Sequence, residues 1–480
     1  MSNLSELLPA GGSSKEFEAV ATGALPNGQA VVLKSDGTVE AVGETSISQS
    51  IPSGSGAQFD SGSSHDGIMT AYDPTTAGRF AVVYSDANNS SYGTIAIGQV
   101  SGTSITFGAS IVFMSAWSHN PKISWSPKTS GQLAIATGRS SKGRIIIGNV
   151  SGTAVTFGAE SIFFDSGIPD HYDMAFDPIT ANRLVIAYRD TNNSGHGTAI
   201  AGTVSGTSVS FGTAVVFRTT NVQNVALSFD PNTANQFVVS YGMQVNSGYG
   251  QAQIGTLSGT NTLSFGSQVT TTLGASAFNA VSYDQKTAGK FYTAFQDSVN
   301  SDRGTAVCCT VSGTTISVGQ MVVFNSGSTR NVSIAGDPNT ANQFLISYRD
   351  NGNSGHGTAI IGTVPNAAGE AGTVMSYASE IVYSASTTVP GNVVFDSFNP
   401  GQFVINVSNP TGRAVLGQVA DDVTNLTSTN FVGTSTAAFT NGQTATIVPK
   451  GGVAASVSNI AIPTSIPDGS SVTYTSARAE

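Results

Sequence analysis

A polar loop motif contains the residues of this chain that could do chemistry. Tyr-Arg-Asp-x-x-Asn-Ser-Gly-His-Gly-Thr stands at 188–198 and again at 348–358, and looser versions occur elsewhere. Oxygen ligands bind calcium, although one carboxylate per loop is few for that ion. An Asp three residues before an Asn can instead cap its own hairpin by accepting bonds from nearby backbone N–H groups. We favour capping and predict no metal, which leaves these Asp residues as weak calcium candidates: Asp86, Asp190, Asp297 and Asp350.

The position before the last glycine of this loop varies while the frame around it is kept. Aromatic rings stack on sugars, and His, Lys and Arg donate hydrogen bonds to them. The varied position therefore predicts a carbohydrate-binding rim, and the alternative is a set of scattered exposed residues without a ligand. In chain order the residues at this position are Tyr92, Lys142, His196, Tyr249, Arg303 and His356, followed by Thr411.

The loops belong to a repeat that fills most of the chain. A turn residue after the first strand of each copy recurs at spacings of 53, 51, 53, 54, 53 and 59 residues, as Asp73, Ser126, Asp177, Asp230, Asp284, Asp337 and Asp396. The clearest copy has four runs rich in β-branched and aromatic residues, at 172–176, 183–188, 197–204 and 208–217. Such runs separated by Gly, Asn and Pro turns are typical of strands. Four antiparallel strands at this period predict an all-β fold, a β-propeller of ~53-residue blades.

The last copy, from Val389, supplies three strands and then leaves the pattern. The segment Ala57–Asp60 matches the fourth-strand exit of other copies, so we expect it to complete the last blade. Closure of this kind removes open sheet edges. The count predicts seven blades over 46–420. The turns that start with Asp-Pro, on the face opposite the polar loops, are expected to be structural.

The two ends of the chain carry related text outside the repeats. Residues 17–42 align without a gap with the segment from Phe431 at an offset of 414, for example Asn27 with Asn441 and Gly28 with Gly442. We predict a lead-in and small β-module over 1–45, and a related small β-module over 421–480. The two could lie side by side as one composite domain.

Composition excludes several functions. The formal charge is −10, the pI is near 4.9, and Lys and Arg form no cluster, so neither nucleic-acid binding nor binding to anionic membranes is expected. No apolar run reaches the length of a membrane-spanning helix, and the first residues lack a charged region followed by an apolar one, so we expect neither a membrane span nor a secretory signal. Cys308 and Cys309 are neighbours in an expected strand, point to opposite faces and should not bond each other.

No catalytic constellation is found. Neither Trp117 nor Trp125 completes the Ser-x-Asp-x-Gly-x-x-Trp box of sialidase-type propellers, and no Gly-x-Ser-x-Gly elbow occurs. The five histidines lack metal-ligand spacing. We therefore expect a protein that is not an enzyme, with no catalytic residue and no cofactor.

The repeat VIAYRDTNNSGHGTAIAGTVSGTSVSFGTAVVF resembles the propeller repeats of virion proteins of marine bacteriophages. The lead-in LSELLPAGGSSKEFEAVATGALPNGQAVVLKSDGTVEAV resembles the module that precedes such repeats. FVGTSTAAFTNGQTATIVPKGGV resembles short β-modules that end phage tail-fibre-like proteins. The resemblance implies a structural protein on the exterior of the virion, assembled in host cytoplasm, with host attachment as its usual task.

Three hypotheses follow. The first is a tail-associated protein whose terminal β-modules bind other virion proteins and whose loop face binds host-surface glycan. The second is a capsid-bound decoration or head-fibre protein. The third and weakest is a glycan-active propeller enzyme. Assembly into a homo-oligomer stays open.

Overall fold

The computed structural model describes residues 17–25, 27–28, 30–34, 37–42, 48–51, 56–62, 65–165, 167, 169–243, 248–364, 374–386, 389–408, 411–420, 431–440 and 442–449. The described chain is all-β, with antiparallel sheets and short 3-10 turns at η1 (Ala87–Asn89), η3 (Ser298–Asn300) and η4 (Asn351–Asn353). No helix within these ranges is long and apolar enough to cross a membrane. Contacts divide the chain into two compact units, Ser48–Val419 and Met1–Ile47 with Ala420–Glu480.

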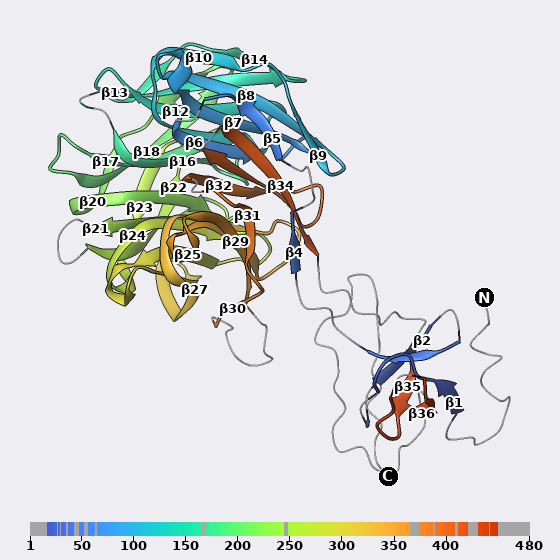
Figure 1. Ribbon diagram of the computed structural model, residues 1–480. Coiled ribbons are helices and arrows are strands. Elements are labelled where there is room, and N and C mark those ends of the chain that lie inside the picture. Colours follow the sequence, from blue (N-terminus) through green and yellow to red (C-terminus); the bar gives the residue numbers. More distant parts are fainter. Residues whose placement is uncertain are drawn as a thin grey trace. The chain divides into compact units, whose positions relative to one another are not determined.

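The repeats form the unit Ser48–Val419 (Figure 1). Their first strands are β6 (His65–Tyr72), β11 (His119–Trp125), β16 (Asp170–Phe176), the later parts of β20 (Val215–Phe229), β24 (Val269–Tyr283) and β27 (Thr315–Gly336), and β32 (Val389–Phe395). The second strands are β7 (Arg79–Asp86), β12 (Gln132–Arg139), β17 (Arg183–Asp190), β21 (Gln236–Met243), β25 (Lys290–Asp297), β28 (Gln343–Asp350) and β33 (Gln402–Ser408). The third strands are β8 (Tyr92–Ser101), β13 (Lys142–Ser151), β18 (His196–Ser205), β22 (Tyr249–Ser258), β26 (Arg303–Ser312), β29 (His356–Thr363) and β34 (Gly412–Ala420).

The outer strand of most repeats is broken into two segments. The first segments are β9 (Ser104–Phe107), β14 (Ala154–Phe157), β19 (Ser208–Phe211), β23 (Thr262–Phe265) and β30 (Ser376–Tyr377). The second are β10 (Ile111–Trp117), β15 (Ser161–Phe164), β31 (Ile381–Ser384) and the early parts of β20 and β24, while β27 runs through without a break.

The continuous strand expected at 208–217 is therefore wrong in detail. Phe211 pairs with Gly202 and Val215 pairs with Ala199, so the outer strand carries one residue more than its partner. An extra residue of this kind interrupts the ladder as a β-bulge does.

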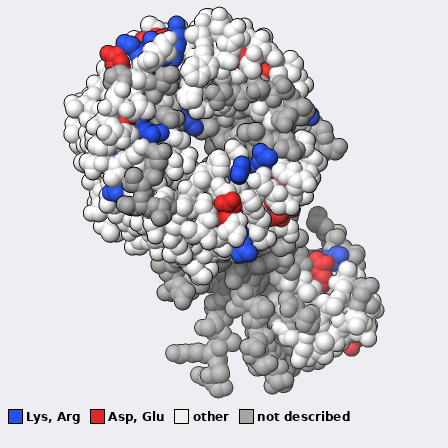
Figure 2. Space-filling view, turned by 60° about the vertical axis from the view of Figure 1, so that its left-hand side comes forward, with Lys and Arg blue, Asp and Glu red and all other residues white. Residues whose placement is uncertain are grey.

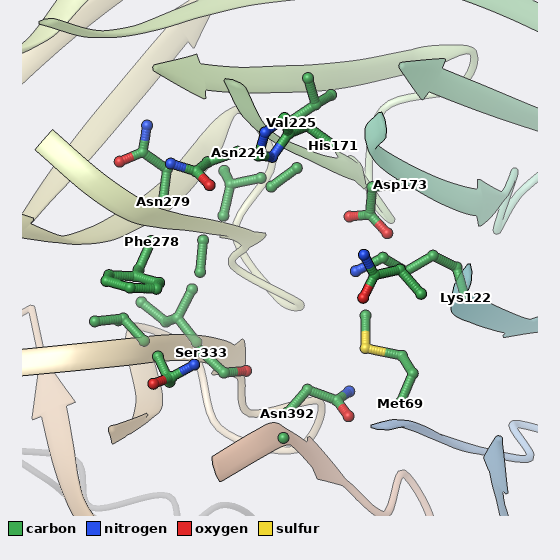
Figure 3. Close-up of a pocket in the computed structure, with 18 of the residues that line it drawn as sticks. Met69, Lys122, His171, Asp173, Asn224, Val225, Phe278, Asn279, Ser333 and Asn392 are labelled. Carbon is green, nitrogen blue, oxygen red and sulfur yellow. The ribbon is translucent and has the colours of Figure 1, made fainter. Parts of the chain in front are cut away.

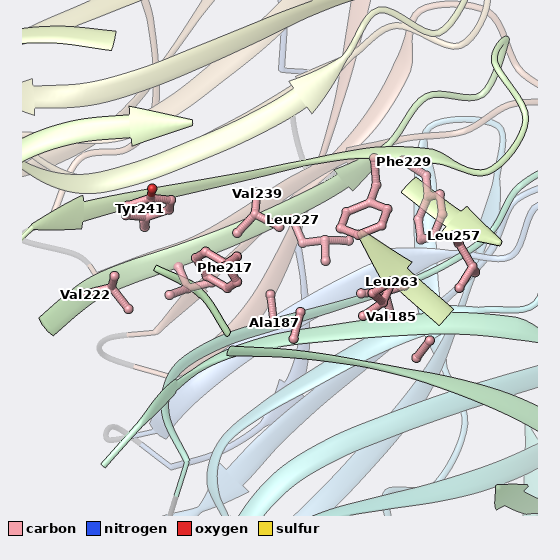
Figure 4. Close-up of a cluster of buried hydrophobic side chains, with 14 of the residues drawn as sticks. Val185, Ala187, Phe217, Val222, Leu227, Phe229, Val239, Tyr241, Leu257 and Leu263 are labelled. Atoms are coloured by element: carbon pink, nitrogen blue, oxygen red, sulfur yellow. The ribbon is translucent and has the colours of Figure 1, made fainter. Parts of the chain in front are cut away.

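The core lies between successive sheets. Second strands are buried along almost their whole length, because neighbouring sheets cover both of their faces. Figure 4 shows one such layer, where Val185 and Ala187 of β17 face Phe217, Val239 and Tyr241. Clusters of this type recur from one pair of repeats to the next.

In six of the described repeats the turn after the first strand is built around a buried carboxylate, and in the second repeat Ser126 takes this place. The Asp73 carboxylate accepts bonds from the guanidinium of Arg79, with its Nε at 2.7 Å, and Asp177 forms an ion pair with Arg183 at 2.6 Å. In each of the six turns that contain an Asp, its Oδ1 atom accepts a hydrogen bond from the backbone N–H two residues later in the chain. These donors are Thr75, Ile179, Asn232, Lys286, Asn339 and Phe398. These contacts give the turns the structural role expected from the sequence.

The last repeat contacts the first. β5 (Gly56–Asp60) pairs with β34 from Gly412↔Asp60 to Val415↔Gly56, and β4 (Ser48–Ser50) also adjoins β34. In Figure 1 the blue β5 lies beside the orange-red β34. The Asn392 side chain exchanges two 2.7 Å bonds with the backbone of Thr70, and Asp396 accepts the N–H of Gly78 at 2.9 Å.

The smaller unit joins both ends of the chain in one five-stranded sheet, in the order β1 (Phe17–Val20), β36 (Thr444–Pro449), β35 (Phe431–Ser435), β2 (Ala30–Leu33) and β3 (Val39–Ala41). Each copy of the duplicated text pairs with the other, β1 with β36 and β2 with β35. Leu25 and Phe439, which are equivalent at the 414-residue offset, exchange backbone bonds of 2.8 and 2.7 Å. The two copies therefore share one described sheet, while 450–480 lie outside the described residues.

Cys308 and Cys309 lie in β26 as free, fully buried thiols, as predicted. Burial raises the pKa of Cys308 to about 12 and that of Cys309 further still. Because the thiolate is the reactive form, we expect neither thiol of the native protein to react with a disulfide reagent at pH 8. Both should react in denaturant, which a colorimetric thiol titration would measure. Fast labelling of the native protein would contradict this burial.

Candidate functional site

The varied loop residues occupy equivalent places in the fold. Tyr92, Lys142, His196, Tyr249, Arg303 and His356 each begin the third strand of their repeat, and Thr411 directly precedes β34. Four of them pair across the hairpin with the Asp of the loop, as Asp86↔Tyr92, Asp190↔His196, Asp297↔Arg303 and Asp350↔His356. They stand one to a repeat, and none of the six lines the pocket described below.

Three of the four loop carboxylates cap their own turns. Asp86 accepts the N–H of Asn88 at 3.0 Å, Asp190 accepts those of Asn192 and Asn193, and Asp350 accepts that of Gly352 at 2.9 Å. Asp297 does not cap η3. Burial raises the pKa of its carboxyl group, and the backbone N–H groups of Val299 and Asn300 lower that pKa by a smaller amount.

The weak calcium candidates Asp86, Asp190, Asp297 and Asp350 stay a sequence-based prediction. Within the described ranges no three His, Cys, Asp or Glu side chains gather as metal ligands. Asp86, Asp190 and Asp350 thus bind the backbone of their own turns.

Two of the basic loop residues have partners in their own repeat. Lys142 forms an ion pair with Asp165, and Arg303 donates to Asn300 Oδ1 at 3.5 Å. Neighbouring Arg139 and Arg144 both bind Glu160, at 2.9 and 2.6 Å. These cationic side chains therefore already have charged or polar partners within their own repeat.

The first repeat carries an aromatic platform, which we define as Tyr92, Trp117 and His119. Trp117, at the end of β10, is the cross-strand partner of Tyr92, and its side chain is 45% exposed. The His119 ring, at the start of β11, lies 5.2 Å from the Trp117 ring at an angle of 50°. In other repeats the partner of the varied residue is small or polar, at Asn221, Ala275 and Ser328.

The aromatic platform was not predicted from the sequence, because Trp117 and His119 complete no catalytic or metal-binding motif. The signal that could have found them is their position, at the end of an outer strand and the start of the next inner strand. Both positions lie on the side of the repeat that carries the polar loop. Trp117 pairs with Tyr92, and Tyr92 begins the third strand directly after that loop.

A pocket of about 550 Å³ lies among the first strands (Figure 3). Its wall takes a short stretch from each repeat, near Met69, Lys122, Asp173, Val225, Asn279, Ser333 and Asn392. These stretches pair with the final residues of the second strands, directly before the polar loops. The pocket therefore lies at the end of the inner strands nearest those loops.

Bulges aim side chains into the pocket. Each first strand has a register shift at this point, as between His119 and Lys122 or between Asp170 and Asp173. The residue inside the shift takes a left-handed conformation at Gly67, Asn120, His171, Asn224, Phe278 and Asn331. Asn and Gly adopt this conformation readily, whereas a bulky residue such as Phe278, with φ of 53°, does so rarely. Strain of this kind gathers at functional sites.

Lys122 and Asp173 are the charged pair of the pocket wall. Both Asp173 oxygens accept backbone N–H groups, from Met174 and Leu227, each at 2.9 Å. Burial raises the Asp173 pKa, while the Lys122 charge and these two bonds lower it. Figure 3 shows both side chains directed toward the same part of the pocket. The formal charges cancel, so the pair gives the pocket polar groups without a net charge.

The wall also keeps a buried carboxamide without partners. Nδ2 and Oδ1 of Asn279 are both buried and have no hydrogen bond among the described residues. Unsatisfied buried polar groups cost free energy and are rare in native proteins. Asn120 differs, because its Nδ2 lies 3.1 Å from His119 Nε2, which makes the pocket and the aromatic platform neighbours.

The surface of the described chain carries few charges. Figure 2 shows one face, where Lys, Arg, Asp and Glu are scattered among uncharged residues. The whole chain has 19 basic and 29 acidic residues in 480, which agrees with this view. The described surface therefore offers more uncharged than charged side chains.

The fold and these sites define an all-β protein of β-propeller-like repeats. No family model matches the chain, and no curated protein matches it. Among solved structures it is similar to the BP39L lectin of Burkholderia pseudomallei, at 10% identity and a TM-score of 0.55, over 75% of this chain and 98% of that one. Sqt1 of Saccharomyces cerevisiae, at 9% identity and a TM-score of 0.45, covers 76% of this chain and 97% of its own. At these identities the likeness concerns the fold alone.

Proposed function

We propose that the repeats form a seven-bladed β-propeller over 46–420, closed by β5 as the outer strand of the last blade. The pairing of β5 with β34 supports closure, as do the bonds from Asn392 and Asp396 to the first repeat. The terminal sheet of β1, β2, β3, β35 and β36 forms a separate domain in this proposal.

We propose that this protein is a non-enzymatic phage virion protein that binds host-surface glycan through the end of the propeller bearing the polar loops. The aromatic platform is the observation that carries the proposal, since an exposed indole beside an imidazole offers a face for a sugar ring. The name of the fold neighbour, a lectin, is consistent with a carbohydrate ligand. The sparse charge favours a neutral glycan.

In this proposal the protein is tail-associated, and its terminal domain binds other virion proteins. Gold-labelled antibody on intact particles, viewed by electron microscopy, tests the location. Label at the tail or its fibres supports attachment, and label over the head supports the alternative of a capsid decoration protein. Particles without any label would overturn the virion assignment while leaving glycan binding to be measured separately.

Replacing Trp117 with Ala is expected to weaken glycan binding by about tenfold to a hundredfold. Burying an aromatic side chain against a ligand is worth about 1.5–3 kcal/mol, and about 1.4 kcal/mol corresponds to tenfold in affinity. Surface plasmon resonance on immobilised host polysaccharide measures the effect. Trp117→Phe should retain part of the affinity.

Leu273→Ala is the matched control, because Leu273 is also apolar, is 78% exposed and lies outside the platform. Its affinity should equal that of the unmodified protein. Equal affinity of the Trp117→Ala variant would rule out the platform as the contact surface.

A further inference from the structure

The pocket among the first strands has the features of a built ligand site. Seven stretches of chain, each about fifty residues from the next, contribute to its wall, and each carries a bulge at the same position. Bulges re-aim side chains and are common beside functional sites. A volume of about 550 Å³ is in the range of small-molecule sites, which span roughly 300–1,000 Å³.

Lys122 supplies hydrogen-bond donors that the protein leaves unused. Among the described residues its ammonium group forms no hydrogen bond and no ion pair within 4.0 Å. It lines the same pocket as Asp173, and Figure 3 shows both side chains directed toward the same part of that pocket. The Asp173 oxygens already accept two backbone N–H groups. A hydroxyl group suits such a pair, because it can accept a bond from Lys122 Nζ and donate one to the Asp173 carboxylate.

The rest of the wall matches a neutral polyhydroxylated molecule. The left-handed bulge positions present the carboxamides of Asn120, Asn224 and Asn331, which both donate and accept. Phe278 and Met69 add apolar surface for the carbon-bound hydrogens of a sugar ring. An anion would need a net positive site, whereas here Asp173 balances Lys122.

We propose that this pocket binds a neutral sugar, either free or as the terminal residue of a glycan, with one hydroxyl held between Lys122 and Asp173. This site goes beyond the proposed attachment function, since it can bind a free sugar whether or not the protein sits on a virion. It is also separate from the aromatic platform, although His119 and Asn120 connect the two.

The test is isothermal titration of the full chain with two matched pairs, D-glucose against D-glucuronate and D-galactose against D-galacturonate. We expect saturable one-to-one binding of at least one neutral sugar, and binding at least tenfold weaker for its acidic counterpart. Lys122→Met should lower the affinity for the neutral sugar at least tenfold. Lys128→Met is the matched control, because Lys128 is an exposed residue of the same repeat in the turn after β11, and it should bind as the unmodified protein does.

A second variant keeps the test decisive if Lys122→Met does not fold. Asn224→Gly removes one carboxamide while keeping the left-handed backbone, since glycine takes positive φ at no steric cost. This variant should bind the same sugar about fivefold to tenfold more weakly. Its melting temperature in the absence of sugar should be unchanged.

Three results would overturn the pocket proposal. They are the absence of saturable binding of any neutral sugar, tighter binding of the acidic sugars than of the neutral ones, and equal affinity of the Lys122→Met and Lys128→Met variants for the neutral sugar. Trp117→Ala distinguishes this outcome from failure of the attachment proposal. It should leave the affinity for the free sugar unchanged while reducing binding to host polysaccharide.

Discussion

Deletion of residues 46–62 is expected to destabilise the whole repeat unit and to lower its melting temperature in one cooperative step. β5 supplies the outer strand beside β34, and Phe59 packs with Tyr84 and Phe107 of the first repeat at ring distances of 5.2 and 5.7 Å. Loss of Phe59 alone costs about 3–5 kcal/mol, as for other buried aromatic residues. The deletion also opens the edge of β34, which invites pairing between molecules.

Differential scanning calorimetry measures the melting temperature, and light scattering measures association through the open edge. Phe59→Ala should reproduce much of the loss, whereas Gln58→Ala, at an exposed position of the same strand, should change little. Unchanged melting of the deletion variant would mean that β5 does not close the repeats.

Replacing Gly255 with Ala is expected to cost about 3 kcal/mol, at the upper end of what overpacking a core usually costs. Gly255 faces Phe237 across the sheet, and a Cβ added there would overlap the ring of Phe237, which is fully buried. The backbone of Gly255 has an ordinary conformation, so the cost comes from steric overlap alone. Phe237 is held between Phe229 and Phe265, at ring distances of 5.3 and 5.8 Å, and has little room to move.

The third repeat offers a matched control. There Gly202 faces Leu184, and an added Cβ would come no nearer than 2.9 Å to its closest neighbour, Val209. Gly202→Ala should therefore cost only about 1 kcal/mol. Denaturant unfolding measures both values, and Phe237→Leu combined with Gly255→Ala should be more stable than the sum of the single changes predicts. Equal costs at the two glycines would contradict the steric argument.

Local sequence was enough to predict the strands and turns of the repeat. The β-branched runs and Gly-rich turns around Tyr188 predicted the second and third strands to within two residues. Capping by Asp190 was also predictable, because its partners lie two and three residues away. The break in the outer strand after Phe211 was not, because a bulge depends on the register of the neighbouring strand.

The candidate sites were harder to predict than the fold. The varied loop residues were correctly placed at one position of every repeat, yet Lys142 and Arg303 turned out to be engaged by neighbours. Trp117 was visible as a rare residue, but its neighbour His119 belongs to the next repeat. The contact between them depends on how two sheets stack, which no local pattern encodes.

The sequence by itself determined the all-β class, the repeat and the loop chemistry, because these depend on propensities and hydrogen bonds within a few residues. Only the tertiary structure decided which distant residues meet. Lys122 and Asp173 are fifty-one residues apart, and Leu25 and Phe439 are equivalent residues from opposite ends of the chain. Such pairs form because stacked sheets bury apolar faces and because shared strands supply hydrogen bonds to open sheet edges. Both requirements depend on the fold of the whole chain and not on a local segment.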